Sequence, residues 1–582
     1  MMPDQDSVLV GHLEFLYGEE QARTTLSHLE DLVRSWSERI EERAPHPLTE
    51  KDVVLITYGD SIHESGERPL ETLADFLTRH VGDVVNTVHI LPFFPYSSDD
   101  GFSVVDYRAV DRSLGDWDDV RRIGSELRLM IDGVINHVSA ESDWFKAFLG
   151  DNPMYREYFT VIGTDTDTAS VFRPRMSPLL TPVHTAAGPR LVWTTFGPDQ
   201  VDLNYRNPAV LLAVIDTLLF YVAQGARMIR LDAIAFIWKE LGTSCIHLPQ
   251  THRIIQLLRA VLDSVTPDVA IVTETNVPHD ENVSYFGDGT NEAHMVYNFA
   301  LPPLMLHAFH TGNTRVLSSW AADLDTPTDR TTFLNFLSSH DGIGVGGARG
   351  MLADDEMDQM AERVEQLGGS VSHKDNGDGT QSVYELNINF LDALEDPALP
   401  DVGTALVARR FLASQAIMLS LRGIPGIYVH SLLGSRSWSE GVDQSGNPRA
   451  INREKLSRET IEADLSNQDS LRHHVLRGYR HLLARRASHP AFSPEADQYV
   501  IPVDASVFAL LRVDRGDRGF VLCLHNVSLT ECSLHIDTTA MPLPESIELI
   551  DLVGGDLFLL EDRTLSLRIE PYQTLWLTED TT

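Results

Sequence analysis

The sequence predicts a (β/α)8 TIM barrel with an inserted subdomain after strand 3, an insertion after strand 7 and a C-terminal β-sandwich domain. Three observations support this fold class. Short apolar runs alternate eight times with stretches of helical periodicity, two intervals between these runs are too long for simple loops, and short alternating strands take over near Ala491. Such alternation indicates parallel strands joined by helical crossovers, and eight units close into a barrel rather than an open sheet.

The barrel is preceded by a predicted helical extension of residues 1–50, in which apolar side chains between Leu26 and Ile40 recur at helical spacing. The segment RAPHPLTEKD ends that pattern. Eight apolar runs of strand length follow, at Val53–Tyr58, Thr87–Leu91, Leu129–Val134, Met228–Ala233, Ala270–Thr273, Met295–Phe299, Phe333–Leu337 and Gly426–His430. Helical stretches separate them, including Leu70–His80, Trp117–Leu127, Ala209–Val222, His252–Ser264, Arg315–Leu324 and Ala405–Ser420. We therefore expect the barrel to occupy residues 51–137, 206–341 and 402–490.

Three further segments complete the predicted organisation. Residues 138–205, irregular and rich in Thr, Pro and Gly, are expected to form an inserted subdomain after strand three. Residues 342–401 form the insertion after strand seven. From residue 491 to 582, runs such as SVFALLRV and RGFVLCLHNV indicate the C-terminal β domain.

The 582-residue chain has a formal net charge of −39, which argues against binding to nucleic acid or an anionic membrane, because both repel such a surface. No apolar stretch reaches the roughly 20 residues that a bilayer requires. The acidic start MMPDQDSVLV lacks the basic region of a signal peptide, so we expect a cytoplasmic protein. The three scattered cysteines, Cys245, Cys523 and Cys532, indicate neither a disulfide framework nor a metal cluster. An anionic substrate would need a local basic pocket to overcome the overall charge.

Charged side chains stand at the carboxyl ends of several predicted strands, where a barrel of this kind carries its chemistry. They are His137 after strand three, Arg230 and Asp232 on strand four, Glu274 after strand five, and His340 and Asp341 after strand seven, with Asp99 in the loop after strand two. A buried ion without a partner costs several kcal/mol, so these groups must pair or take part in function. The structural alternative is a set of buried ion pairs that fix the barrel. The convergence of so many groups at one end of the strands favours a functional site.

Three carboxylates in one place need a chemical reason, because like charges raise one another's pKa and weaken the fold. Cleavage of a glycosidic bond supplies one. A retaining mechanism uses one ionised carboxylate as nucleophile and one carboxylic acid to protonate the leaving oxygen, about 5 to 5.5 Å apart. Arg230, two residues before Asp232 on the same strand face, would keep the nucleophile anionic, and Glu274 would be the acid.

The motifs DGVINH, IRLDA, VTET and SSHD, in this order and at these strand ends, resemble the four signature regions of glycoside hydrolase family 13, the α-amylase family. The resemblance spans the barrel from Val53 to about His430. It implies that Asp232 is the nucleophile, Glu274 the general acid/base and Asp341 the carboxylate that stabilises the transition state, and that His137, Arg230 and His340 line a glucose site. It implies no metal and no organic cofactor.

Within this family the chain is most similar to sucrose phosphorylase and its relatives, through HILPFFPYSSDDGFSVVDY, RLVWTTFGPDQVDLNY and GNPRAINRE. That likeness implies that Asp99 and Arg449 bind the far hydroxyls of glucose and that Phe102 and Phe196 flank the sugar. The motif FRPR, with Arg173 and Arg175, resembles a loop proposed to meet phosphate, and its guanidiniums would provide the basic pocket required above. The implied activity is a retaining phosphorylase of small α-glucosides, which transfers glucose to inorganic phosphate and yields α-glucose 1-phosphate.

The N-terminal extension and the segment FIWKELGTSCIHLPQTH resemble glucosylglycerate-type phosphorylases more than compact sucrose phosphorylases. Two features depart from the family pattern. Glu385 follows Tyr384 where the acceptor loop carries a neutral residue, so we expect both at the phosphate or acceptor site and leave the acceptor open among glycerate, glycerol, fructose and fructose 6-phosphate. The segment DAIAFIWK lacks the Lys-His pair that amylases carry after the nucleophile, which argues against a polysaccharide groove.

Other functions stay open at this point. The protein could be a sucrose phosphorylase proper or a glucosylglycerol phosphorylase, or a family 13 hydrolase or transglucosidase that uses water or a sugar in place of phosphate. A non-catalytic barrel that serves as a binding subunit is a third alternative, and the intact carboxylates argue against it. The sequence also leaves the oligomeric state open, and an apolar face on the N-terminal extension would suit a homodimer.

Overall fold

Eight parallel strands close a barrel at the centre of the computed structural model, which describes residues 5–41, 43–376, 379–399, 402–516 and 519–579. In chain order the strands are β1 (Val54–Thr57), β3 (Thr87–Ile90), β4 (Arg128–Gly133), β10 (Ala226–Leu231), β11 (Ala270–Thr273), β12 (Met295–Tyr297), β13 (Thr332–Asn335) and β17 (Ile424–Tyr428), and β17 pairs with β1 to complete the barrel. All eight predicted strands are confirmed, with ends that differ by no more than two residues. Nearly all their residues are buried, because side chains fill the interior and helices cover the outside.

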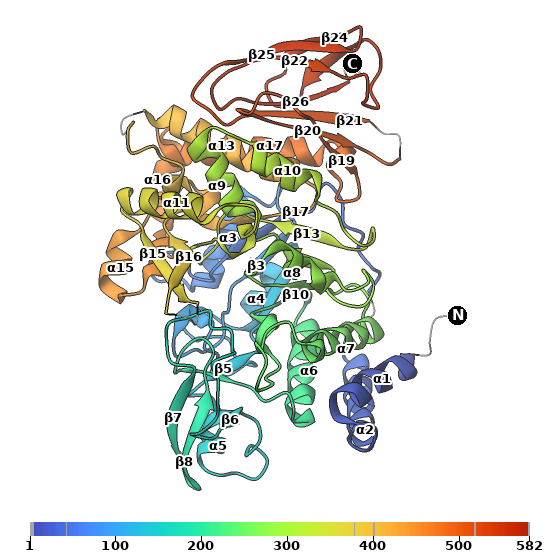
Figure 1. Ribbon diagram of the computed structural model, residues 1–582, viewed down its shortest axis with the longest axis vertical. Helices are drawn as coiled ribbons and strands as arrows, with labels where there is room; N and C mark the ends of the chain where they lie inside the picture. The colour runs from blue at the N-terminus through green and yellow to red at the C-terminus, as the bar shows by residue number, and fades with distance from the viewer. Residues whose placement is uncertain (1–4, 42, 377–378, 400–401, 517–518, 580–582) are drawn as a thin grey trace.

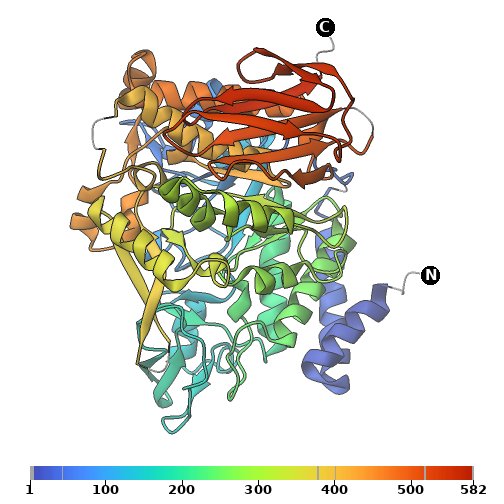
Figure 2. The same ribbon diagram turned by 45° about the horizontal axis from the view of Figure 1, so that its top comes forward.

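Helices surround the barrel (Figures 1 and 2). They are α3 (Pro69–His80), α4 (Trp117–Glu126), α6 (Pro208–Ala223), α7 (Pro249–Val265), the short α8 (His279–Val283), α9 (Leu301–Thr311), α10 (Arg315–Ala322), α13 (Thr404–Ser420) and α17 (Leu471–Ala487). The sequence pattern does not reveal α9, because its first nine residues are all buried and leave no polar face to mark a helical period. Every helix predicted between two barrel strands is confirmed.

The N-terminal extension forms two helices, α1 (Gln5–Tyr17) and α2 (Glu19–Ser37), that pack against α6 and α7 (Figure 1). The indole Nε1 of Trp36 donates a hydrogen bond of 2.8 Å to Asp216 Oδ1 on α6. Leu29 on α2 is fully buried. The apolar face that the sequence offers for a homodimer is therefore covered by helices of the same chain.

Two insertions leave the barrel from the carboxyl ends of strands. Between β4 and α6 lie β5 (His137–Ser139), α5 (Asp143–Leu149), β6 (Val161–Ile162), β7 (Leu180–Thr185), β8 (Gly188–Trp193) and β9 (Gln200–Asp202). Between β13 and α13 lie β14 (Ile343–Gly344), α11 (Asp354–Gln366), β15 (Ser370–Asp375), β16 (Gln381–Asn387) and α12 (Phe390–Ala393). Both insertions stand at the end of the barrel where active sites form. The predicted boundaries at residues 1, 401 and 582 lie outside the described residues.

The stretch between β17 and α17 folds over the same end of the barrel. It contains α14 (Val429–Leu432), α15 (Ser439–Ser445), β18 (Leu456–Ser457) and α16 (Arg458–Ser466). The strand β18 pairs in parallel with β2 (Ile62–His63), which follows the first barrel strand. This pairing connects the last barrel unit to the first.

The C-terminal domain is a single antiparallel sheet of eight strands rather than two separately bonded sheets. Its strands are β19 (Asp497–Val500), β20 (Val507–Val513), β21 (Phe520–Asn526), β22 (Cys532–Asp537), β23 (Ile547–Asp551), β24 (Leu557–Glu561), β25 (Thr564–Ile569) and β26 (Thr574–Glu579). One hydrophobic core takes side chains from both ends of the sheet, among them Leu522 and Leu534, so the sheet folds over itself in two layers (Figure 1). The predicted fold class is confirmed.

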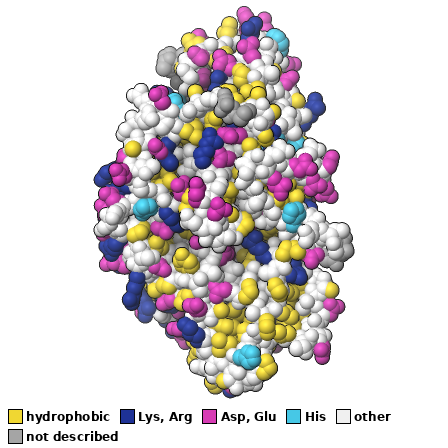
Figure 3. Space-filling model, turned by 90° about the vertical axis from the view of Figure 1, so that its left-hand side faces the viewer, with side chains coloured by type: hydrophobic (Ala, Val, Ile, Leu, Met, Phe, Trp, Pro, Cys, Tyr) yellow, Lys and Arg dark blue, Asp and Glu magenta, His cyan; other side chains and the backbone are white. Residues whose placement is uncertain are grey.

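The surface of the molecule is acidic, and Figure 3 shows Asp and Glu side chains spread over the face that it presents. None of the described helices is both long and apolar enough to cross a membrane.

Candidate active site

A cavity lies at the carboxyl ends of the barrel strands, and most of the site residues predicted from the sequence line it. Its walls include Asp99, Phe102, His137, Arg175, Phe196, Asp232, Glu274, His340, Asp341, Tyr384, Glu385 and Arg449. Arg230 lies immediately beneath the carboxylates, and only Arg173 stands apart. The barrel brings these residues together from segments more than three hundred positions apart in the chain.

Arg230 on β10 is the buried cation of the site. It stands opposite Asp132 of β4 in the strand register, so both side chains point to the same side of the sheet. Its Nη1 donates to Asp132 Oδ1 at 2.5 Å and to Asp232 Oδ1 at 2.9 Å. Asp132 in turn bonds His89 Nε2 at 2.7 Å, and both of those side chains are fully buried. The Arg230 guanidinium is thus fixed by carboxylates on two sides.

Glu274 follows β11 and approaches the same guanidinium. Its Oε2 lies 3.8 Å from Arg230 Nη2 and accepts a hydrogen bond of 3.1 Å from the backbone N–H of Ala233. Ala233 adopts the left-handed conformation, with φ of 48°, directly after Asp232. That turn lets the chain present the Asp232 carboxylate and an amide donor for Glu274 from adjacent residues.

The carboxyl groups of Asp232 and Glu274 share one electrostatic environment. Burial raises the pKa of Asp232 well above its usual range, and the Arg230 guanidinium opposes this rise. Burial also raises the pKa of Glu274, with Arg230 opposing and Asp341 adding to the rise. The pair therefore retains a proton at a pH where two exposed carboxylic acids would both be ionised.

Asp341 is held in the opposite state by basic neighbours. Its Oδ1 lies 2.5 Å from Arg449 Nη1 and 3.4 Å from Arg453 Nη2. Burial alone would raise the pKa of Asp341, but Arg449, His340 and Arg453 together lower it well below its usual value. Asp341 is accordingly a permanent anion beside a pair that carries a proton.

Aromatic and imidazole rings line the cavity beside the carboxylates. Phe102 stacks on His340 with ring centroids 4.9 Å apart and an interplanar angle of 4°. Phe196 contacts His137, with centroids 5.4 Å apart. Burial lowers the pKa of His340 to about 3 and also lowers the pKa of His137, so both rings are neutral near pH 7. Neutral imidazoles beside flat apolar rings suit the hydroxyls and the faces of a sugar.

Asp99 belongs to a strained loop after β3. Asp99, Asp100 and Gly101 form a short 3-10 turn and have positive φ angles of 54°, 47° and 109°. Gln200 of β9 donates to Asp99 Oδ2 at 3.2 Å. The loop is held further by Arg453, whose Nη1 bonds Asp100 Oδ2 at 2.5 Å. Strain of this kind persists only where surrounding contacts hold it, which is typical of functional sites.

The insertion after strand seven delivers Glu385, which is buried. Arg449 donates two hydrogen bonds to this carboxylate, from Nε to Oε1 at 2.9 Å and from Nη2 to Oε2 at 2.8 Å. Arg175 Nη1 reaches Oε2 at 3.5 Å, and the backbone N–H of Gly342 donates to Oε1 at 2.6 Å. Although burial works in the other direction, Arg449 and Arg175 keep the pKa of Glu385 below its usual range. Glu385 therefore holds Arg449 between itself and Asp341.

The two arginines of the FRPR motif take different positions. Arg175 lines the cavity and lies over the ring of Tyr384, 6.0 Å from its centroid. Arg173 donates to the carbonyl oxygen of Ser177 at 2.5 Å, within its own loop. The structure thus brings one of the two guanidiniums to the cavity.

Among the residues at the site that sequence reasoning missed, three contact the predicted charged groups directly. Asp132 lies in the buried strand that precedes His137, and the rule that a buried charge must pair or act would have found it. Arg453 stands four positions after Arg449 in GNPRAINRE, where both arginines reach Asp341. No sequence signal marks Gln200, because an amide in a short strand is unremarkable until its partners are known.

No group of three or more His, Cys, Asp or Glu side chains is arranged to hold a metal ion within the part of the chain that the structure describes. The acidic groups of the site are instead neutralised by Arg230, Arg449 and Arg453.

Comparison with known proteins gives consistent likenesses. The family model described as the catalytic domain of α-amylase matches residues 81–351. A glucosylglycerate phosphorylase of Spirochaeta thermophila is 50% identical over 577 residues, covering 97% of this chain and 97% of that protein. A glucosylglycerate phosphorylase of Allomeiothermus silvanus is 46% identical over 99% of both chains. The crystal structure of sucrose 6F-phosphate phosphorylase from Thermoanaerobacter thermosaccharolyticum superposes with a TM-score of 0.72 at 22% identity, covering 88% of this chain and 97% of that one.

Proposed function

The chain belongs to glycoside hydrolase family 13, the α-amylase family, and we propose that it is a retaining phosphorylase that transfers glucose from glucosylglycerate to inorganic phosphate. The products are α-glucose 1-phosphate and glycerate. One observation supports this function above the others. Three buried carboxylates face one cavity in a chain that is about half identical, from end to end, to proteins of that activity.

In the first step of the proposed reaction, Asp232 attacks the anomeric carbon while Glu274 gives its proton to the departing glycerate oxygen. A covalent β-glucosyl enzyme results. The positions of the charges support this division of roles. Arg230 lies 2.9 Å from Asp232 and 3.8 Å from Glu274, so its guanidinium stabilises a negative charge more strongly on Asp232, which supports the assignment of the shared proton to Glu274.

In the second step, inorganic phosphate attacks the glucosyl enzyme from the face that glycerate left. Glu274, now ionised, accepts a proton from the incoming phosphate, and α-glucose 1-phosphate leaves with retained configuration. Asp341 binds the sugar hydroxyls more strongly as the ring flattens towards the oxocarbenium ion, and Arg449 keeps it ionised for that task.

The remaining residues bind the two halves of the substrate. We assign Asp99, His137, His340 and Arg449 to the glucose hydroxyls, and Phe102 and Phe196 to the faces of the ring. Arg175 and Tyr384 line the cavity beside Glu385, and we assign them to phosphate and to the acceptor. Arg173 points to carbonyl oxygens of its own loop, so phosphate contact by Arg173 requires a rearrangement of FRPR.

The rival reaction within the family is hydrolysis or transfer to a sugar. Purified protein supplied with glucosylglycerate and no phosphate tests it directly. The proposed function requires that glycerate release depend on added phosphate, and release at an equal rate without phosphate would overturn it. Supplying α-glucose 1-phosphate with glycerate, glycerol, fructose or fructose 6-phosphate in turn and measuring the released phosphate identifies the acceptor, with glycerate expected to be fastest.

Three further points about the setting of the enzyme belong to this proposal. The three cysteines are free thiols, which supports a reducing compartment such as the cytoplasm. The net charge of −39 supports the absence of nucleic acid among its partners. If two copies associate, the contact lies elsewhere than on the apolar face of α1 and α2, because α6 and α7 occupy that face.

A further inference from the structure

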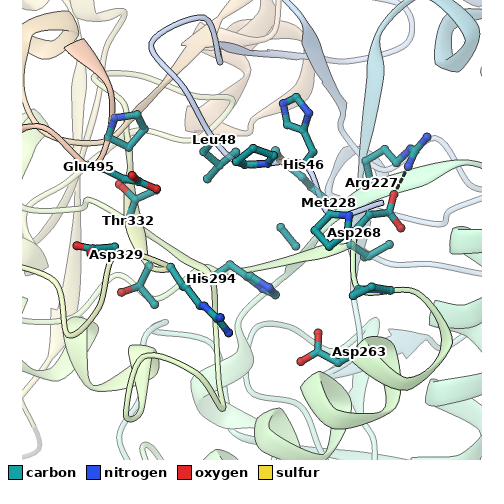
Figure 4. Close-up of a pocket in the computed structure, with 18 of the residues that line it drawn as sticks. His46, Leu48, Arg227, Met228, Asp263, Asp268, His294, Asp329, Thr332 and Glu495 are labelled. Carbon is teal, nitrogen blue, oxygen red and sulfur yellow. Dashed lines mark hydrogen bonds and ion pairs between the residues drawn. The ribbon is translucent and has the colours of Figure 1, made fainter. Parts of the chain in front are cut away.

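A second cavity, of about 940 Å³, is shown in Figure 4, and it lies at the opposite end of the barrel from the active site because its lining includes the first residues of several barrel strands. Its floor is formed where barrel strands begin, with Arg128 on β4, Met228 on β10, Ala270 on β11 and Thr332 on β13. Met228 precedes Asp232 by four residues, which places the cavity about 13 Å along β10 from the nucleophile at 3.3 Å per residue. The cavity is thus separate from the catalytic site.

The walls of this cavity come from three parts of the chain. The segment from Ala44 to Leu48 closes one side, and Glu495 and Arg515 of the C-terminal region close another. Figure 4 shows His46 and Leu48 facing His294 across an open space. A ligand in this space would touch the N-terminal segment, the barrel and the C-terminal region together.

Arginines are concentrated around this cavity. Seven arginines and four carboxylates line it, in a chain whose net charge is −39. The Arg227 guanidinium is paired with Asp268, and Arg259 Nε bonds Asp263 Oδ2 at 2.7 Å. Three more of the arginines pair with carboxylates outside the lining, Arg128 with Asp52, Arg422 with Asp325 and Arg515 with Asp497, so five of the seven guanidiniums are neutralised.

Among the described residues, Arg43 and Arg330 are the two lining arginines whose guanidiniums form no hydrogen bond and no close ion pair with a carboxylate. The Nη1 of Arg43 is buried and makes no hydrogen bond. Burial lowers the pKa of Arg43 and the nearby Arg227 lowers it further, whereas the carboxylates of Asp268 and Glu41 oppose this change. Arg330 stands exposed at the cavity; burial raises the pKa of the neighbouring Asp263, and Arg259 and Arg330 oppose that rise. A buried donor without a partner costs free energy, and an anion in the cavity would remove that cost.

Apolar groups lie between these charges. Pro45, Pro47, Leu48, Met228 and Val269 contribute to the lining. Guanidiniums bind phosphate and carboxylate groups in bidentate fashion, whereas prolines and aliphatic side chains need a carbon skeleton to contact. The lining is therefore suited to an organic anion rather than to an inorganic ion alone.

We propose that this cavity binds a multivalent organic anion, such as a sugar bisphosphate or a polycarboxylic acid, through Arg43 and Arg330. The ligand bridges the N-terminal segment and the barrel and stabilises their contact. Since the ligand binds the folded protein only, it raises the temperature of unfolding, and the rise grows with the logarithm of the ligand concentration above the Kd. The proposal is independent of the reaction at the opposite end of the barrel.

The test uses the full-length protein and two probes, fructose 1,6-bisphosphate and citrate, in isothermal titration calorimetry and in thermal unfolding. At least one probe is expected to bind and to raise the unfolding temperature. The variant Arg43→Gln/Arg330→Gln is expected to weaken the Kd of that probe about tenfold or more, because two hydrogen bonds to a charged group are lost. The two probes distinguish phosphate from carboxylate chemistry.

The matched control is Arg112→Gln/Arg477→Gln, which removes two exposed arginines outside both cavities and should leave the Kd unchanged. Retained turnover of α-glucose 1-phosphate shows that each variant is folded. Absence of binding by both probes up to their solubility limits would overturn the proposal. So would an equal Kd in the Arg43→Gln/Arg330→Gln variant, because the probe would then occupy the active site or the general surface.

Discussion

Arg230 sets the charge balance of the active site at the scale of single residues. It is buried and lies within 4 Å of the carboxylates of Asp132, Asp232 and Glu274. Asp132 is bonded to His89 and cannot move, so the guanidinium stays in place whatever the charge on the other two carboxyl groups. Glu274 can therefore lose and regain its proton, and Asp232 can lose its charge to the glucosyl ester, without loss of the structure around them.

The first prediction separates the roles of these two carboxyl groups. Glu274→Gln should lower the rate of phosphorolysis of glucosylglycerate by about 10² to 10⁴-fold, because the departing glycerate loses its proton donor. Cleavage of α-glucosyl fluoride should fall far less, since fluoride departs without a proton. The measurement is the steady-state rate of Glu274→Gln relative to the unmodified protein on each of the two substrates.

The control for this experiment is Asp232→Asn. Removal of the nucleophile should abolish both reactions, by about 10⁶-fold. Equal losses on both substrates in Glu274→Gln would show that Glu274 is not the acid.

The second prediction concerns pH. The active enzyme carries one proton on the pair of Asp232 and Glu274, so kcat/KM should be bell-shaped. Activity falls on the acid side when both groups are protonated, and on the alkaline side when both are ionised. Because burial raises the pKa of each group, both limbs should lie at higher pH than those of exposed carboxylic acids. A profile recorded with α-glucose 1-phosphate and glycerate, flat from acid to alkali, would contradict this assignment.

At the scale of elements, the loop after β3 decides where the sugar-binding side chains stand. Three successive residues with positive φ turn the chain so that Asp99 and Phe102 face the cavity. Gly101 lies against the preceding strand end, and a Cβ at this position would stand 2.5 Å from the carbonyl oxygen of Pro92. Only glycine fits there, both for its φ of 109° and for the space.

The third prediction follows from this contact. Gly101→Ala should displace the loop and raise the KM for glucosylglycerate about tenfold or more, since Asp99 and Phe102 lose their positions. The control is Gly188→Ala in the hairpin of β7 and β8, where φ is 112° and a Cβ meets nothing within 4 Å. Comparison of the KM values of the two variants separates the steric effect from the effect of backbone strain. An unchanged KM in Gly101→Ala would show that the loop does not position groups that bind the sugar.

At the scale of the whole molecule, most of the excess negative charge lies on the surface, whereas the buried carboxylates of the active site are paired with arginines. Few cations balance the carboxylates on the surface, whereas arginines gather beneath the catalytic carboxylates and in the cavity at the opposite end of the barrel. A net charge of −39 destabilises the compact state through self-repulsion. The buried pairs are shielded from solvent and depend little on salt.

The fourth prediction is that salt stabilises the protein. The unfolding temperature should rise between low ionic strength and about 1 M potassium chloride, where the screening length falls to about 3 Å. Differential scanning calorimetry measures it. The variant Glu30→Gln/Asp358→Asn/Glu365→Gln, which removes three exposed carboxylates, should show a smaller rise. A fall of the unfolding temperature with salt would mean that surface ion pairs, not repulsion, dominate.

The sequence by itself determined the barrel strands, the C-terminal β domain and most of the residues that line the candidate active-site cavity. Apolar runs and helical periods are local properties, and charged side chains such as Asp232 and Glu274 stand out within them because burial of an ion needs a reason. These features can be read without knowing which segments meet. The sequence did not predict helix α9, because the helix is buried on nearly all sides and its apolar residues show no helical periodicity.

Only the tertiary structure decided how the loops combine. Several contacts join segments that are far apart in the chain. Arg449 binds both Glu385 and Asp341, Arg453 binds Asp100 in the loop after β3, and α2 packs on α6. No local pattern encodes such pairs, because each depends on where the barrel places the ends of its strands. The cavity at the opposite end of the barrel has the same origin, since its arginines come from seven separate places in the sequence.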